Sequence, residues 1–115
     1  MRSPAMPDDA PDRGPGSDVE TPLGFVVRCT VAWWTHVTAV KHPAMRGRMD
    51  DVVRTLRAPS EIRRSRTDAA VHLFYRVDGE RRWVCVVARR EDGSGFLITT
   101  YPTDAIKEGE RVWPA

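Results

Sequence analysis

A stripe of apolar residues between positions 45 and 56 has the spacing of one face of a helix. Its members stand at i, i+4, i+7, i+8 and i+11: Met45, Met49, Val52, Val53 and Leu56. The stripe predicts a helix that begins near Ala44 and ends before Pro59, because proline cannot continue a helix. Arginine dominates the opposite face, so this helix is expected to bury only one of its sides.

A shorter helix is predicted over residues 31–41. Its apolar stripe consists of Trp33, Val37 and Val40. His42 and Pro43 end it, because the residue before a proline is pushed out of the helical region. Trp34 cannot share a helix face with its neighbour Trp33, and we expect Trp33 to be the core residue.

The remaining apolar runs have the β-branched and aromatic composition of strands. These runs are residues 25–29, 61–66, 71–77, 83–90 and 96–101. The run 61–66 is polar and is expected to be an edge strand, and Thr103 is expected to start a short helical turn ending at Gly109. Strand, two helices and then consecutive strands predict an α+β fold: an N-terminal helical segment packed on one face of a twisted antiparallel sheet of four to five strands. The other face would be free to hold a ligand.

Composition divides the chain near residue 20. Four of the nine prolines lie in the first 15 residues, and the first aromatic residue is Phe25. Such a segment cannot offset its ordering entropy, so residues 1–20 are expected to be a disordered tail and 21–115 a single domain. The chain shows neither the apolar run of a signal peptide nor the ~20 apolar residues of a membrane span, and we expect a cytoplasmic location.

Charge follows the same division. The first 24 residues carry two arginines against five carboxylates, whereas the rest carry 16 basic and 11 acidic groups, 14 of the 16 being arginine. Arginine forks fit phosphate, so this balance suits a polyanionic partner, and it suits a solvated surface equally well. Cys29 and Cys85 have no CxxC or zinc-site spacing and are expected to be buried thiols, with no metal or cofactor predicted.

Several segments together resemble a family of small nucleases. They are Trp-Trp-Thr-His-Val-Thr-Ala-Val-Lys-His-Pro (33–43), Val-His-Leu-Phe-Tyr-Arg (71–76), Trp-Val-Cys-Val-Val-Ala-Arg (83–89), and Phe-Leu-Ile-Thr-Thr-Tyr-Pro (96–102) followed by Ile-Lys-Glu-Gly-Glu (106–110). The chain over 25–113 resembles the phage and bacterial nuclease-like domains grouped with barnase, EndoU, the colicin-type tRNA-cutting toxins and RelE. The resemblance implies a metal-independent endoribonuclease, a toxin or prophage-derived effector, that acts on RNA such as tRNA and has a cognate antitoxin or immunity protein.

The positions that match this family are the catalytic candidates: His36, His42, Arg89, Thr99 and Tyr101. Metal-free RNA cleavage needs a base for the 2′-hydroxyl, an acid for the leaving 5′-oxygen and a cation for the phosphorane. Histidine suits either proton transfer, arginine suits the phosphate, and threonine or tyrosine hydroxyls can hold its oxygens. The chain lacks an obvious strand-borne glutamate that could serve as the base.

His42 is the first choice, because the helix dipole favours a charged imidazole at a helix carboxyl end. The alternative is a plain C-capping role. His36 lies six residues earlier, about 120° from facing His42 on an α-helix, so a catalytic pair requires the helix to end before His42. Arg89 can reach only one sheet face, and Thr99 and Tyr101 share a face that is either open to a ligand or merely solvated.

Five further residues are predicted to bind RNA: Arg63, Arg64, Arg66, Tyr75 and Arg76. The arginines could track a phosphate backbone or protect an edge strand from aggregation. Tyr75 could stack on a base or belong to the core. Two hypotheses therefore stand: an endoribonuclease, or a non-catalytic RNA- or protein-binding module of the same fold, antitoxin-like or immunity-like.

Overall fold

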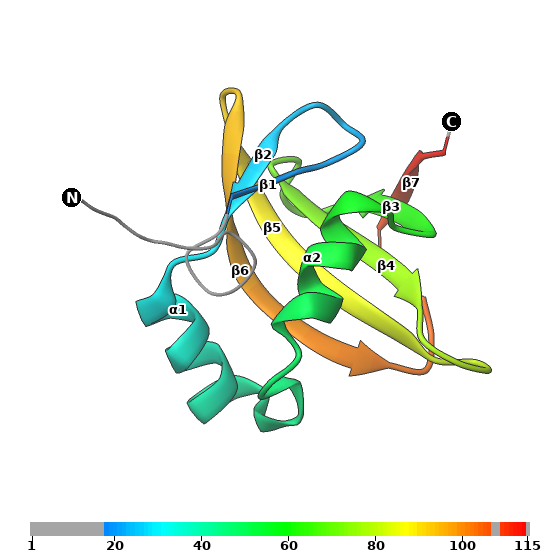
Figure 1. Ribbon diagram of the computed structural model, residues 1–115. Coiled ribbons are helices and arrows are strands. Elements are labelled where there is room, and N and C mark those ends of the chain that lie inside the picture. Colours follow the sequence, from blue (N-terminus) through cyan, green and yellow to red (C-terminus); the bar gives the residue numbers. More distant parts are fainter. Residues whose placement is uncertain (1–17, 107–108, 115) are drawn as a thin grey trace.

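The computed structural model describes residues 18–106 and 109–114 (Figure 1). The elements in chain order are β1 (Asp18–Glu20), β2 (Val26–Arg28), α1 (Val31–His36), the π-helical turn η1 (Val37–Lys41), the 3-10 turn η2 (Pro43–Met45), α2 (Met49–Arg57), β3 (Glu61–Arg64), β4 (Val71–Val77), β5 (Trp83–Glu91), β6 (Ser94–Thr103) and β7 (Glu110–Trp113). Their strands form one sheet in the order β1-β2-β6-β5-β4-β3-β7. The predicted α+β class is confirmed.

The sheet is larger than predicted. Within the described residues it has seven strands rather than four to five, and it is mixed because β2 pairs with β6 in parallel. The two additional strands are the edge strands β1 and β7, three and four residues long, which are too short and too polar to give a strand pattern. β1 takes the last three residues of the predicted tail; residues 1–17 lie outside the described residues.

One face of the sheet is covered by α2, which lies across it in Figure 1. We call this side the helix face. All five residues of the predicted stripe are buried, in one cluster with Phe74, Val84 and Val86 of the sheet. Burying one large apolar side chain contributes about 1.5–3 kcal/mol, so this contact is the main source of stability. The predicted start near Ala44 is wrong, because Met45 lies in η2, Gly47 has a positive φ of 78°, and α2 begins at Met49.

The predicted helix over 31–41 is present but changes its winding. The Thr38 hydroxyl donates to the Trp34 carbonyl (2.9 Å), a side-chain bond that competes with the backbone ladder, and the chain continues as η1. The wider π-turn rotates the following residues, so that Val40, expected in the stripe, is 67% exposed. Trp34 lies in the core and Trp33 packs at its margin, the reverse of the prediction.

The opposite side of the sheet, which we call the far face, is partly covered. The connection from β6 to β7 must pass β5, β4 and β3, and its Ile106 packs on a small cluster of Leu73, Tyr75 and Cys85. Gly109 then meets β3 so closely that a Cβ would lie 2.7 Å from the Arg64 carbonyl oxygen. The far face is therefore less open than predicted.

Two local predictions in this region are also wrong. β3 pairs with β4 and with β7, so it is an inner strand and not an edge. Residues 104–106 form no helical turn after Thr103, and 107–108 lie outside the described residues. Among the helices that the structure describes, none is long and apolar enough to cross a membrane.

Candidate functional site

The far face brings three of the five catalytic candidates onto one surface. Cys85 pairs with Tyr101 and Val87 pairs with Thr99, so these side chains project from the same side of β5 and β6. Arg89 follows on β5 with the same alternation. The sheet thus confirms the predicted shared face of Thr99 and Tyr101.

His42 reaches this surface from the helical segment. Its backbone N–H donates to the Val37 carbonyl (2.8 Å), which closes η1, and its own carbonyl accepts from the Met45 N–H (3.0 Å) in η2. Held between two tight turns, the half-buried imidazole lies with its centroid 5.3 Å from that of the Tyr101 ring, tilted by 41°. The His42 ring is therefore held beside Tyr101 of β6.

A second group of contacts lies on the same helical segment. The His36 ring stacks on Trp33 at 4.9 Å, and the Lys41 ammonium lies 5.2 Å from the centre of the same indole. The indole N–H donates to the Ile98 carbonyl (2.7 Å), which fixes Trp33 beside β6. Both groups of contacts, Trp33 with His36 and Lys41, and His42 with Tyr101, border β6, and we refer to them together as the imidazole cluster.

Lys41 is the residue that sequence reasoning missed. It follows Trp33 by eight residues, about 12 Å along an α-helix, so α-helical spacing alone does not predict that the two side chains meet. A cation over an indole gains about 0.5–1 kcal/mol at an exposed site, enough to bias its position. The cluster thereby acquires an ammonium group next to His42 in the chain.

Thr99 occupies a less accessible position than the prediction required. Its Oγ1 is inaccessible to solvent and has no hydrogen-bond partner among the described residues. A buried hydroxyl without a partner costs about 1–3 kcal/mol. Thr99 therefore lies under the surface that Tyr101 borders, and a ligand on that surface would not touch its oxygen directly.

Arg89 is not brought to the imidazole cluster. It donates to Asp68 (2.7 Å) and lies 3.5 Å from Glu91, and the hydrogen bond to Asp68 raises the Arg89 pKa. The same hydrogen bond, with one from the Ala70 N–H, lowers the pKa of Asp68. Arg89 is four residues from Cys85, the partner of Tyr101, which is about 13 Å along a strand. One phosphate cannot contact both ends of that span.

The predicted RNA-binding arginines serve the β3 end of the sheet. Arg63 and Arg66 both donate to the Gly109 carbonyl, at 3.1 and 3.3 Å, and Arg64 pairs with Glu110 at 3.0 Å. They hold the β6–β7 connection and β7 in place. Three strand spacings, about 14 Å, separate β3 from β6 and the imidazole cluster.

The other two predicted RNA contacts, Tyr75 and Arg76, are not exposed on the surface near His42 either. Tyr75 is 2% exposed and belongs to the Leu73–Cys85 cluster, so its ring is not available to a base. Arg76 is half-buried and pairs with Val84, a residue of the helix face. Arg76 lies on the helix face, away from the imidazole cluster, whereas Tyr75 belongs to the buried cluster on which Tyr101 packs.

The remaining reactive groups are structural. His72 is 7% exposed on the helix face, 5.6 Å from the Phe25 ring, and burial lowers its pKa against an opposing hydrogen bond with the Ala70 backbone. Both cysteines are buried thiols, as expected, and burial raises the pKa of Cys29 to about 11. A thiol with that pKa stays protonated and is a poor nucleophile.

The fold and the site define a small α+β domain with an imidazole cluster at one end of the far face. Among residues 18–106 and 109–114, no group of three or more histidine, cysteine, aspartate or glutamate side chains could hold a metal ion. No protein-family model, curated protein or solved structure matches this chain.

Proposed function

We propose that the protein is a metal-independent endoribonuclease whose reacting groups belong to the imidazole cluster. The observation that carries the proposal is the contact of His42 with Tyr101 of β6, whose ring centroids lie 5.3 Å apart. The Trp33 indole, which contacts His36 and Lys41, is hydrogen-bonded to the same strand. Two imidazoles and an ammonium group are the functional groups that metal-free cleavage of RNA needs.

In this scheme His36 takes the proton of the 2′-hydroxyl while that oxygen attacks phosphorus. The bond from phosphorus to the 5′-oxygen breaks, and His42 gives a proton to the departing oxygen. The products are a 2′,3′-cyclic phosphate and a 5′-hydroxyl, and exchange with water restores both histidines. Lys41 replaces Arg89 as the cation for the phosphorane, because Arg89 is already paired with Asp68.

The test is incubation of the full chain with single-stranded RNA in excess chelator. We expect cleavage to persist and the products to end in a 2′,3′-cyclic phosphate. The His42→Ala variant should lose about 10²–10⁴-fold in rate, the usual contribution of one proton-transfer group. Val40→Ala is the matched control, because Val40 lies in the same segment and is largely exposed.

Three results would overturn the proposal: cleavage that requires an added divalent cation, cleavage unaffected in His42→Ala, or no cleavage at all. Circular dichroism of each variant shows whether a loss of rate reflects unfolding. Rescue of His42→Ala by added imidazole would assign the loss to the missing ring rather than to a changed backbone.

A non-catalytic RNA-binding module is the second candidate. The observation in its favour is that the two imidazoles contact different rings, His36 that of Trp33 and His42 that of Tyr101. Such a module would bind RNA with a strong salt dependence and leave it intact. Binding without cleavage in the same assay would select this candidate.

A further inference from the structure

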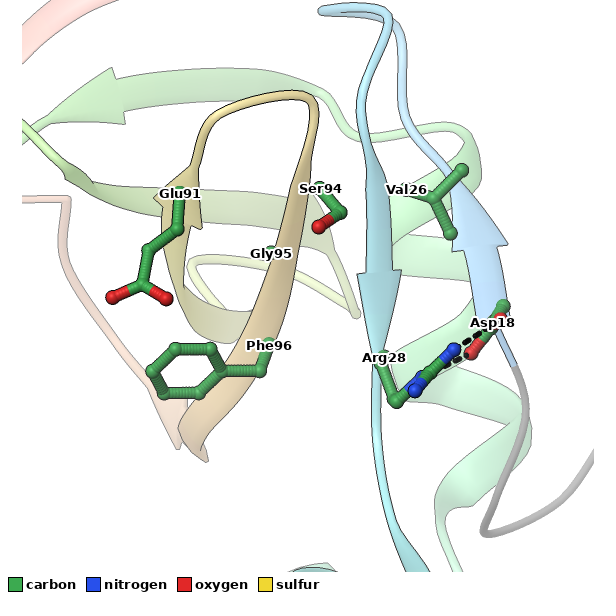
Figure 2. A pocket seen from close by; sticks show the side chains of 7 residues that line it. All are labelled: Asp18, Val26, Arg28, Glu91, Ser94, Gly95 and Phe96. Atoms are coloured by element: carbon green, nitrogen blue, oxygen red, sulfur yellow. Dashed lines mark hydrogen bonds and ion pairs between the residues drawn. The ribbon is translucent and has the colours of Figure 1, made fainter.

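A groove runs along β2 and β6, next to the imidazole cluster. Figure 2 shows its two sides, with the Phe96 ring and the Glu91 carboxylate on one and the Arg28–Asp18 pair on the other. The groove has a volume of about 470 Å³, and a second hollow of about 310 Å³ adjoins it, sharing Arg28 and Phe96. Trp33 lines this second hollow, so the groove leads directly to the cluster.

Phe96 is the residue of this groove best suited to contact a ligand. It is 42% exposed, and it is the aromatic member of the large hydrophobic residues that the described chain leaves exposed. Its strand is held on both sides, by Arg28 of β2 and Arg89 of β5. The intervening Gly95 cannot carry a side chain, because a Cβ there would lie 2.6 Å from the Arg89 carbonyl oxygen. The Phe96 ring therefore stands on a strand that is paired on both sides and closely packed at Gly95.

The charges of the groove select a neutral ligand. Among the described residues that line it, Asp18 and Glu91 are carboxylates and Arg28 is a cation; Arg28 is bonded to Asp18 at 3.1 and 3.4 Å, and Glu91 lies 3.5 Å from Arg89. The Arg28 guanidinium is already engaged by Asp18 and so is a weak site for a phosphate, whereas a nucleobase is uncharged, offers amino groups to carboxylates and has a face that stacks on an aromatic ring. Phosphates of the same strand would lie toward Lys41.

We propose that this groove is a nucleobase subsite, in which an unpaired base stacks on Phe96 while the adjoining phosphate lies at the imidazole cluster. The inference rests on the proposed function and adds its substrate class, single-stranded RNA. A duplex is excluded because a base within it is already stacked and paired and cannot turn onto the ring.

Binding is measured by fluorescence anisotropy with a labelled single-stranded oligonucleotide that is 2′-O-methylated throughout. This probe cannot be cleaved, because its 2′-oxygens are blocked. Removal of one stacking ring in Phe96→Ala should weaken binding by about five- to 150-fold. Phe96→Trp should retain wild-type affinity, since an indole stacks equally well. Val77→Ala, a second exposed hydrophobic residue distant from the groove, should bind as the wild type does.

The subsite is wrong if Phe96→Ala and the wild type bind the probe equally, or if a blunt duplex of the same sequence binds as tightly as the single strand. Failure of the proposed function gives a different pattern: the probe binds, Phe96→Ala weakens it, and unmodified RNA is not cleaved. In an active enzyme, Phe96→Ala raises KM and leaves kcat within about twofold, because stacking on Phe96 is remote from the reacting atoms.

Discussion

The two faces of the sheet use the same strands in different ways. On the helix face, sixteen of the described residues form one buried cluster, whereas the far face has a buried cluster of three with partly buried neighbours. Successive side chains of β5 and β6 point to opposite faces, so the neighbour of each residue on the helix face lies on the far face. Packing is concentrated on one side, and the polar groups of the other are available for chemistry.

The far face itself is divided between its two ends. At the β3 end the arginines are bonded to Gly109 and Glu110 and hold the last strand in place. At the β6 end His42 and Lys41 contact aromatic rings rather than carboxylates. A cation that already pairs with a carboxylate is less available to bind a polyanion than a cation that contacts an aromatic ring. If the protein acts on RNA as proposed, the imidazole cluster is the end of the far face at which RNA would bind.

The largest effect is expected from removing apolar volume on the helix face. Leu56 is fully buried between α2 and the sheet, so Leu56→Ala should lower the free energy of unfolding by about 2–5 kcal/mol. Val87→Ala, at a half-buried far-face position, should cost less than half as much. Urea unfolding followed by circular dichroism measures both.

Leu56→Met is the control for this comparison, since it conserves volume and should cost less than about 1.5 kcal/mol. Equal losses for Leu56→Ala and Val87→Ala would show that the two faces contribute alike. In that case the conclusion that packing is concentrated on the helix face is wrong.

A smaller effect is expected from His72, a buried polar side chain on the helix face. Burial lowers its folded-state pKa below the usual 6.5, and Arg90 and Arg64 act in the same direction. Between the two pKa values the unfolded chain binds a proton that the native protein excludes. This part of the stability is therefore complete above about pH 6.5 and is lost as pH falls toward the folded-state pKa.

His72→Phe should remove that contribution. Free energies of unfolding at pH 7.5 and pH 5.0 give the test: the wild type should lose more stability on acidification than the variant. The difference between the two pH values cancels any change in packing that the new ring causes at both. An unchanged pH dependence in His72→Phe would mean that His72 is solvated in the native protein.

The helix face was largely predictable because it follows simple periods. The α2 stripe and the central strands arise from repeated apolar positions, which local sequence displays directly. The edge strands β1 and β7 were not predictable, since three or four residues such as Asp-Val-Glu owe their strand conformation to their neighbours. The exchange of Trp33 and Trp34 has a similar cause, because the indole N–H of Trp33 finds its partner at Ile98, 65 residues away.

The sequence predicted where some candidate residues lie, but not which residues come together at the site. Alternation placed Thr99 and Tyr101 on one face, and the proline after His42 ended the helix where the ring emerges. Arg89 shares that face, yet its pairing with Asp68 depends on a loop whose course no periodicity reveals. Lys41 joined the cluster through the π-turn, a change of winding that α-helical spacing does not anticipate.

The smallest effect sharpens the difference between paired and unpaired cations on the far face. Asp68→Asn removes the carboxylate that bonds Arg89 at 2.7 Å, leaves Glu91 3.5 Å from Arg89, and keeps an oxygen to accept from the Ala70 N–H. We expect tighter binding of single-stranded RNA, with the slope of log K against log salt steeper by about 0.7, the value for one additional phosphate contact. Asp50→Asn makes the same change in net charge at an exposed position of α2 and should leave the slope unchanged. If both variants steepen it alike, RNA responds to the overall charge of the protein, and the two ends of the far face do not differ in the way their pairing suggests.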